Sequence, residues 1–382
     1  MTGFFTSPRI AWGPGAIEQL SGLGARRALV IVDPAVGRRG GERRIVEELA
    51  KSDTHVEVET AEATANRVDP VVRLRDRISA GSPDWVVVVG GGRTIDAVKA
   101  ARLAAERADV AVESVTPTHD FPDPPRVRLA AVPTTSGSGA EASWTADLLA
   151  PDGTPIEIAH RALVPDWALV DVGCAEGLGP EQVVDGAFET ACLAVEAYLS
   201  AWSNPWSDAL ALHAFATVVR RLPNALRWSD DPEAKAALHS AATEAGLAAS
   251  NAQRGVAHAL ARALEGPTAL PYGRLTGILL PWVAEFDHPS ARDRLEALAL
   301  ASVDPEKLAP VPLPARLRRL GEVARLPPTL RAAGVPIERL AAARSTVLEH
   351  ALRSPAVLAN PRVPTGDDIG ALLDAAAGTG LP

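Results

Sequence analysis

The stretch Asp84-Trp-Val-Val-Val-Val-Gly-Gly-Gly-Arg-Thr-Ile-Asp96 decides the fold. Its apolar run, Trp85 to Val89, is unbroken, which is typical of a central parallel strand buried on both faces. Three glycines, Gly90, Gly91 and Gly92, close the run, and apolar residues then recur at helical spacing from Asp96 to Arg107. The stretch therefore predicts a strand, a glycine turn and a helix, the unit of a doubly wound parallel sheet.

Further short strands are predicted on both sides of this unit. They span 28–33, 54–59 and 128–133, and amphipathic segments separate them. This alternation predicts an α/β domain with a doubly wound parallel sheet over residues 1–180, which we expect to bind a dinucleotide.

Beyond residue 180 the β-rich runs largely vanish, and long segments rich in Ala, Leu and Arg replace them. Such segments predict an all-α domain over residues 181–382, with the substrate and catalytic groups on it. The predicted helices are Pro180–Ala201, Pro205–Leu222, Pro232–Asn251, Arg254–Glu265 and Leu275–Phe286, with more toward the C-terminus. The proline-rich segment 302–336 is expected to contain connections between helices.

Composition excludes several classes of partner. The chain has 382 residues and a net charge of −9, which argues against nucleic acid and anionic membranes because both attract basic surfaces. Two cysteines, Cys174 and Cys192, are too few for a disulfide framework, and both are expected to be small buried thiols. The N-terminus lacks the pattern of a signal peptide, so we expect a cytoplasmic protein without a membrane segment.

Two glycine-rich turns predict a nucleotide site. Gly90-Gly91-Gly92-Arg93-Thr94 follows one predicted strand, and Pro133-Thr134-Thr135-Ser136-Gly137-Ser138-Gly139 follows another. Because parallel strands end at the same edge of a sheet, both turns are expected there, where backbone N–H groups and hydroxyls bind phosphates. Arg93, Thr94, Thr134, Thr135 and Ser138 are therefore candidate cofactor contacts.

Asp33 ends the predicted strand 28–33 and suggests which dinucleotide is bound. A carboxylate at that place hydrogen-bonds the adenine ribose hydroxyls and repels a 2′-phosphate, so NAD is favoured over NADP. The alternative is an aspartate that forms the turn before Pro34.

The order Gly90-Gly-Gly-x-x-x-Asp96-x-x-Lys99, followed by Pro133-Thr-Thr-Ser-Gly-Ser-Gly-Ala-Glu141, resembles the group III, iron-dependent alcohol dehydrogenases. That superfamily also includes glycerol dehydrogenase and dehydroquinate synthase. The resemblance implies that the first glycine loop binds the pyrophosphate and that the second covers the cofactor. It also implies that Asp96 and Lys99 lie nearby on the following helix, and that the protein is a dimer.

Members of that family hold one divalent metal with an Asp, a His four residues later and two further His. Glu196-Ala197-Tyr198 matches the family and sets the register. Glu189 then stands in the Asp position and Leu193 in the first His position, whereas His258 matches the next ligand and Tyr272 replaces the last. A leucine has no ligating atom, and tyrosine is a rare ligand for Fe²⁺ or Zn²⁺. We therefore expect no functional metal, although a slipped register with Asp185, Glu189 and His258 could form a weak site.

The remaining polar groups predict catalysis without a metal. His258 and Tyr272 are candidates for the contact with the reacting hydroxyl, with Glu189 nearby. Arg262 lies four residues after His258 on one helix face and suits a substrate carboxylate. An ordinary structural role is the alternative for Arg262, Tyr272 and Glu189.

The sequence thus predicts an NAD-dependent, metal-independent dehydrogenase that oxidises a hydroxyl group. A β-hydroxy acid would fit, because its β-keto product loses CO₂ readily. The C-terminal threonine of a biosynthetic peptide, as in daptide-type pathways, is one such substrate by analogy, and a pathway partner protein could accompany it. The alternatives are a reductase of a small aldehyde or keto acid, similar to maleylacetate reductases, and an inactive NAD-binding scaffold.

Overall fold

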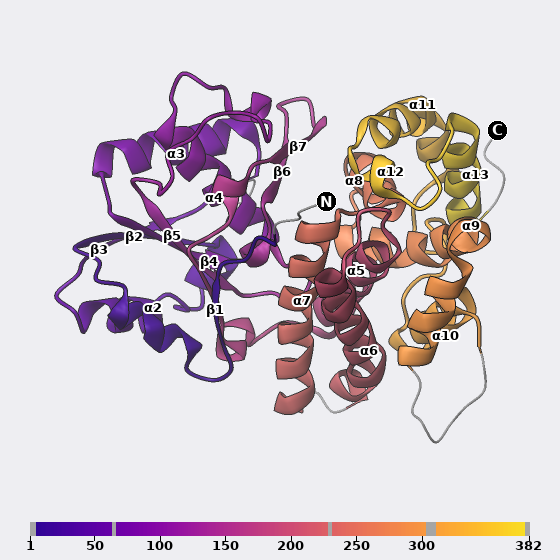
Figure 1. The fold of residues 1–382 in the computed structure, drawn as a ribbon, viewed down its shortest axis with the longest axis horizontal. Coiled ribbons are helices and arrows are strands. Elements are labelled where there is room, and N and C mark those ends of the chain that lie inside the picture. The colour runs from indigo at the N-terminus through magenta and orange to yellow at the C-terminus, as the bar shows by residue number, and fades with distance from the viewer. Residues whose placement is uncertain (1–4, 63–65, 228–230, 303–310, 379–382) are drawn as a thin grey trace. The chain divides into compact units, whose positions relative to one another are not determined.

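The computed structural model describes residues 5–62, 66–227, 231–302 and 311–378. The chain divides into two compact units, Met1–Leu178 and Gly179–Pro382. The first unit contains the sheet and the second is built of helices (Figure 1).

A six-stranded parallel sheet forms the centre of the first unit. Its order is β1 (Arg9–Trp12), β8 (Trp167–Val170), β5 (Arg128–Pro133), β4 (Trp85–Gly90), β2 (Arg27–Val32) and β3 (His55–Thr60). Neighbouring strands run parallel throughout. The predicted doubly wound sheet is confirmed. A separate antiparallel hairpin, β6 (Thr145–Leu149) and β7 (Pro155–Ala159), was not predicted.

Helices cover both faces of the sheet. On β4, Val86 and Val88 share a core with α3 (Val68–Gly81) and α4 (Gly92–Glu106). Val87 and Val89 share a second core with the helices on the other face, which are α1 (Pro34–Gly37), α2 (Arg43–Ala50) and the 3₁₀ helix Ala16–Gly22. Since consecutive strand residues point to opposite faces, this two-sided burial explains the unbroken apolar run of β4.

The second unit is helical, as predicted, and has one continuous apolar core. Its helices are α5 (Pro180–Leu199), α6 (Pro205–Arg227), α7 (Pro232–Ala252), α8 (Val256–Thr268), α9 (Tyr272–Ala301), α10 (Leu313–Ala324), α11 (Ile337–Arg353), α12 (Ala356–Ala359) and α13 (Gly366–Ala377). No helix in the described part of the chain is long and apolar enough to cross a membrane.

One prediction for this unit needs correction. The helix α9 continues well beyond Phe286, because the chain absorbs Pro289 at a kink where Ala291 leaves helical geometry (φ −137°, ψ 29°). The segment 302–336 contains a helix connection, as predicted, at 325–336, and it also holds the twelve-residue helix α10, whose apolar face is buried; residues 303–310 lie outside the described range.

Helices α5 and α9 cross at two glycines, and this crossing positions the candidate active site. A Cβ atom on Gly273 would overlap the backbone carbonyl oxygen of Asp185. One turn later, a Cβ on Gly277 would lie 2.9 Å from the side chain of Phe188. The two backbones therefore approach to a distance that only glycine permits, and Tyr272, at the start of α9, is held against α5 and α8.

We expect Gly273→Ala to lower the unfolding free energy by about 1–3 kcal/mol, because α5 must move away from α9. Gly266→Ala in α8 is the matched control: Gly266 is exposed and helical, and a Cβ there meets no atom within 4 Å. The control should be neutral or more stable by about 0.5–1 kcal/mol. Thermal unfolding of both variants measures the difference, and equal Tm values would contradict the close crossing.

Candidate active site

The two glycine-rich loops meet at one edge of the sheet. Gly90 of β4 pairs in parallel register with Pro133 of β5. The N–H of Thr134 then donates to the carbonyl of Gly90 at 3.0 Å. Both loops thus leave the sheet side by side, as the sequence predicted.

The glycines allow the second loop to lie directly on the first. A Cβ on Gly92 would stand 2.5 Å from the hydroxyl oxygen of Ser138, and one on Gly91 would stand 3.2 Å from Thr135. Gly91 is also the N-cap of α4 and has no side chain of its own to cap the helix. Such a cradle of backbone at the positive end of a helix fits a pyrophosphate.

The carboxylate of Asp33 stabilises the turn before Pro34, which was the alternative role for this residue. One oxygen accepts the N–H of Ala35 at 2.8 Å and so caps α1. The other accepts the hydroxyl of Thr94 at 2.9 Å, which ties the end of β2 to α4. Asp33 and Thr94 are thus joined beside the first glycine loop, with the negative charge of Asp33 at the edge of the cradle.

Asp96 and Lys99 connect α4 to the segment that follows the second loop. The ammonium of Lys99 is fully buried and contacts the carbonyls of Ala140 at 2.9 Å and Thr145 at 2.5 Å, and the hydroxyl of Ser143 at 2.8 Å. Burial lowers the pKa of Lys99, and Asp96 at 3.4 Å opposes that shift. Lys99 therefore holds the segment that follows the second loop against α4. Arg93 lies exposed on the first turn of α4.

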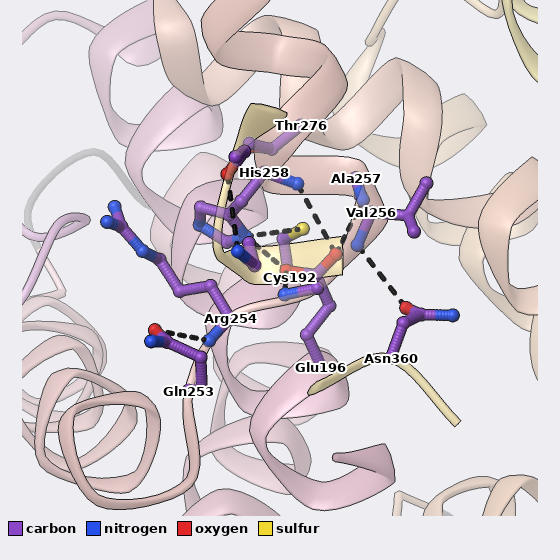
Figure 2. A network of polar contacts seen from close by, with 12 residues as sticks. Cys192, Glu196, Gln253, Arg254, Val256, Ala257, His258, Thr276 and Asn360 are labelled. Atoms are coloured by element: carbon purple, nitrogen blue, oxygen red, sulfur yellow. Dashed lines mark hydrogen bonds and ion pairs between the residues drawn. The ribbon is translucent and has the colours of Figure 1, made fainter. Parts of the chain in front are cut away.

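In the helical unit, the carboxylate of Glu196 on α5 caps the N-terminus of α8 (Figure 2). One oxygen accepts the N–H of Ala257 at 2.6 Å and that of His258 at 3.3 Å. The other accepts the N–H of Gly255 at 2.9 Å. A Cβ on Gly255 would lie 3.0 Å from this carboxylate, so glycine is needed for its approach.

One nitrogen of the His258 imidazole contacts the same carboxylate. Its Nδ1 makes a short hydrogen bond with Glu196 and lies 3.5 Å from the sulfur of Cys192. Because a carboxylate only accepts, Nδ1 carries the proton and Nε2 of the neutral ring is an acceptor. His258 is 3% exposed, and its Nε2 is buried without a partner among the described residues.

Arg262 and Tyr272 lie beside His258, as predicted. The guanidinium carbon of Arg262 lies 4.3 Å from the centre of the Tyr272 ring, and that ring lies 5.7 Å from the imidazole. Arg262 also donates to Glu265 at 2.8 Å, so its charge is partly balanced within α8. The hydroxyl of Tyr272 faces the backbone carbonyl of His258 at 3.5 Å.

Among the described residues, Asp185, Glu189 and His258 do not gather as a set of metal ligands. Arg274 binds both carboxylate oxygens of Asp185, at 3.0 and 3.1 Å, which commits that group to an ion pair. Burial raises the pKa of Asp185 despite this arginine. Glu189 is half-buried on α5, one turn before Leu193, whose side chain is buried and has no ligating atom.

Within the described residues, the side chains that gather as metal ligands do are Cys192, Glu196 and His258, with ligand atoms within 4.8 Å of one another. They do not fit an ion. Burial raises the pKa of the Cys192 thiol well above its usual range, so the thiolate that a metal needs is disfavoured. Each Glu196 oxygen already accepts two donors, and the short contact to His258 leaves no space between them.

A second buried pair supports the start of α8. The amide oxygen of Asn360 accepts the N–H of Val256 at 3.3 Å, and its nitrogen donates to Asp287 at 2.6 Å. Asp287 is 1% exposed, and burial raises its pKa to about 7, with a further contribution from the negative charge of Glu196. The N-terminus of α8 is thus fixed by Glu196 directly and by Asp287 through Asn360.

Sequence reasoning missed four members of this cluster: Cys192, Glu196, Asp287 and Asn360. Glu196 served only to set the register, although its spacing from Cys192 puts both on one face of a helix. Asp287 and Asn360 are separated by 73 positions, and no local pattern connects them.

Two family models match the chain: iron-containing alcohol dehydrogenase over residues 7–172, and the C-terminal part of the Fe-containing alcohol dehydrogenase family over residues 183–377. The NADPH-dependent butanol dehydrogenase of Clostridium saccharobutylicum is 26% identical over 374 residues, which cover 96% of this chain and 95% of that one.

Two solved structures are similar in fold. The iron-containing alcohol dehydrogenase of Thermococcus thioreducens has a TM-score of 0.88 at 25% identity, covering 98% of this chain and 99% of that one. The sulfoacetaldehyde reductase of Bifidobacterium kashiwanohense, in complex with NAD⁺, has a TM-score of 0.85 at 22% identity, covering 99% of this chain and 100% of that one.

We expect Asp287→Asn to change how stability depends on pH. The folded state keeps the proton of Asp287 up to about pH 7, whereas an ordinary aspartate releases it near 3.8. The folded state therefore binds more protons between these values, so stability is fully present below the lower value and is lost as pH rises through the upper one. The variant keeps an oxygen for Asn360 and removes this loss, which amounts to at most about 4 kcal/mol.

Urea unfolding of both proteins at about pH 5 and about pH 8 measures the effect. The variant should be the more stable protein at the higher pH, with a smaller difference between the two conditions. Parallel pH profiles would contradict the protonated state of Asp287.

Proposed function

The chain belongs to the iron-containing alcohol dehydrogenase family, whose members are oxidoreductases that act on CH–OH groups, and from that premise we propose that it oxidises a hydroxyl group with NAD and without a metal. One observation carries the proposal: the buried Nε2 of His258 has no partner among the described residues. A buried acceptor without a partner costs about 1–3 kcal/mol, and a substrate hydroxyl would satisfy it.

Oxidation of an alcohol needs a base for the hydroxyl proton and an acceptor for the hydride. Bound NAD⁺ supplies the hydride acceptor. His258 accepts the proton at Nε2, and the Glu196 carboxylate at Nδ1 offsets the positive charge that the ring acquires. Arg262, stacked on Tyr272, contributes a positive charge near the oxygen that loses the proton. These groups supply a base and electrostatic stabilisation from side chains alone.

The metal-independent mechanism rests on the ligand positions of the family. Leu193 and Tyr272 stand where this chain's resemblance to the family places two histidine ligands, and Arg262 brings a cation to the same helix face. A guanidinium and a leucine both disfavour a bound divalent ion. The loss of ligands and the gain of a positive charge are consistent with one site adapted to work without metal.

NAD is the proposed cofactor because of the charge at the cradle. Gly91 and Gly92 would hold the pyrophosphate, and the carboxylate of Asp33 stands beside them through Thr94. A 2′-phosphate near that carboxylate would be repelled. The Clostridium relative is NADPH-dependent by name, so a comparison of NAD⁺ and NADP⁺ as cofactors tests this point directly.

A β-hydroxy acid remains the proposed substrate class, with the C-terminal threonine of a biosynthetic peptide as one example. Arg262 carries this proposal, since a guanidinium binds carboxylates well. Its ion pair with Glu265 means that a substrate carboxylate would have to share the guanidinium. Comparing β-hydroxy acids with simple alcohols therefore decides the substrate class. Reduction of a small aldehyde or keto acid would be the reverse of the same reaction.

Turnover by metal-stripped protein tests the proposal. NAD⁺ is given with β-hydroxy acids, simple alcohols and threonine-ending peptides, and NADH formation is followed. We expect activity that a chelator leaves unchanged, and His258→Asn should lower kcat by about 10²–10⁴-fold, as for loss of a general base. His213→Asn is the matched control, because that side chain is 70% exposed on α6.

Loss of activity on chelation, with recovery on adding Fe²⁺ or Zn²⁺, would overturn the metal-independent mechanism. Tight NAD⁺ binding without turnover of any substrate, in either direction, would favour the scaffold.

Binding of NAD⁺ tests the cradle separately. Gly92→Ala should weaken binding at least tenfold, because a methyl group at 2.5 Å from the Ser138 hydroxyl pushes the second loop off the first. Gly22→Ala is the control, since a Cβ there meets no atom within 4 Å. Calorimetric titration of both variants gives the comparison, and equal affinities would contradict a nucleotide site at these loops.

A further inference from the structure

The carboxylate of Glu196 is surrounded by donors of two kinds. Three are backbone N–H groups, of Gly255, Ala257 and His258, and these always donate. The fourth is the Nδ1 of the His258 ring, which donates in one tautomer and accepts in the other. Only the imidazole can therefore respond to a change at position 196.

We propose that Glu196 is a positioning residue that fixes His258 in the Nδ1–H tautomer, so that Nε2 is the base of the reaction. This inference rests on the proposed function. It assigns to Glu196 a role that the loss of metal ligands makes necessary: an imidazole that no longer binds an ion at Nε2 needs another group to keep the proton off that nitrogen.

The burial of the pair makes the assignment firm. Glu196 is 4% exposed and His258 is 3% exposed, so water does not compete for either group. The neighbouring thiol of Cys192, at 3.5 Å from Nδ1, stays neutral because burial raises its pKa, and it adds no second negative charge. Charged hydrogen bonds in such surroundings are about twice as strong as neutral ones.

The reaction balances with this pair. The O–H bond of the substrate breaks and its proton passes to Nε2 of His258. The carbinol C–H bond breaks, and its hydride passes to the oxidised nicotinamide dinucleotide as the C=O double bond forms. The ring then carries one positive charge, facing the Glu196 carboxylate, which stays ionised. A carboxylate that orients a histidine base in this way is known to act through tautomer and orientation rather than by taking the proton itself.

The substitution Glu196→Gln reverses the tautomer. Its amide has one accepting oxygen and one donating NH₂ group. The amide oxygen can face the backbone N–H groups of Ala257 and His258, or it can face the N–H of Gly255 and the imidazole. Backbone N–H groups cannot accept a hydrogen bond, so only the imidazole can change its tautomer and accept from the NH₂ group. We therefore expect the NH₂ group to face the ring, Nδ1 to become the acceptor and the proton to move to Nε2, where it blocks proton abstraction.

The experiment is ¹⁵N NMR of the histidine rings, on the full chain labelled at histidine, together with steady-state kinetics. His258→Asn assigns the His258 signals. Wild type should show the Nδ1–H tautomer and Glu196→Gln the Nε2–H tautomer. The variant should lose about 10²–10⁴-fold in kcat, while the KM for NAD⁺ stays within about twofold.

Asn360→Ala is the matched control. It removes the other side-chain acceptor at the start of α8, the partner of Val256, and leaves the Glu196 contact in place. This variant should lose stability and keep both the tautomer and kcat. If it reduces kcat as much as Glu196→Gln does, capping of α8 explains the effect and the proposal is overturned.

Two further outcomes would overturn the proposal. One is the Nε2–H tautomer in wild type, a measurement that does not depend on the folding of any variant. The other is full activity in a Glu196→Gln protein whose tautomer has changed. Failure of the proposed function gives a different result: wild type would then turn over no hydroxyl substrate, while the NMR signals would still report the tautomer of His258.

Discussion

The hydrogen bonds that converge on the Glu196 carboxylate hold the helical site together. This single group joins α5 to the start of α8, occupies N–H groups that a helix start otherwise leaves unpaired, and orients the imidazole of His258. A buried carboxylate would be costly without such partners, and here every lone-pair direction has a donor. Stability and orientation of the base thus depend on the same atoms.

In the proposed function, the groups around Glu196 replace a metal ion with side chains. In a metal enzyme, a carboxylate behind a ligating histidine fixes the ring and increases its basicity toward the ion. In this chain the outer nitrogen of the His258 ring has no partner among the described residues, and we propose that a substrate hydroxyl binds there. Arg262, stacked on the ring of Tyr272, agrees with this proposal because its positive charge would repel a metal ion nearby.

Much of the fold could be predicted from the sequence because burial on two faces leaves a strong pattern. The unbroken run of β4 and the glycines after it predicted the strand, the turn and α4. The cluster at α8 could not be predicted in the same way. Glu196 meets His258 across 62 positions, and Asn360, at the end of α12, meets Asp287 of α9 across 73 positions. The hairpin β6–β7 was missed although Asp152-Gly153 between its strands is a local turn signal.

The cluster around Lys99 has a consequence for the dynamics of nucleotide binding. One buried ammonium joins α4 to the residues that follow the second glycine loop, and Thr134 joins the two loops at the sheet. If the cofactor binds at these loops, as we propose, contacts of this kind hold the cradle in place before binding. Little conformational entropy is then lost on binding, and affinity depends mainly on the contacts themselves. For the same reason, the time for which a cofactor stays bound is governed by those contacts rather than by the folding and unfolding of a loop.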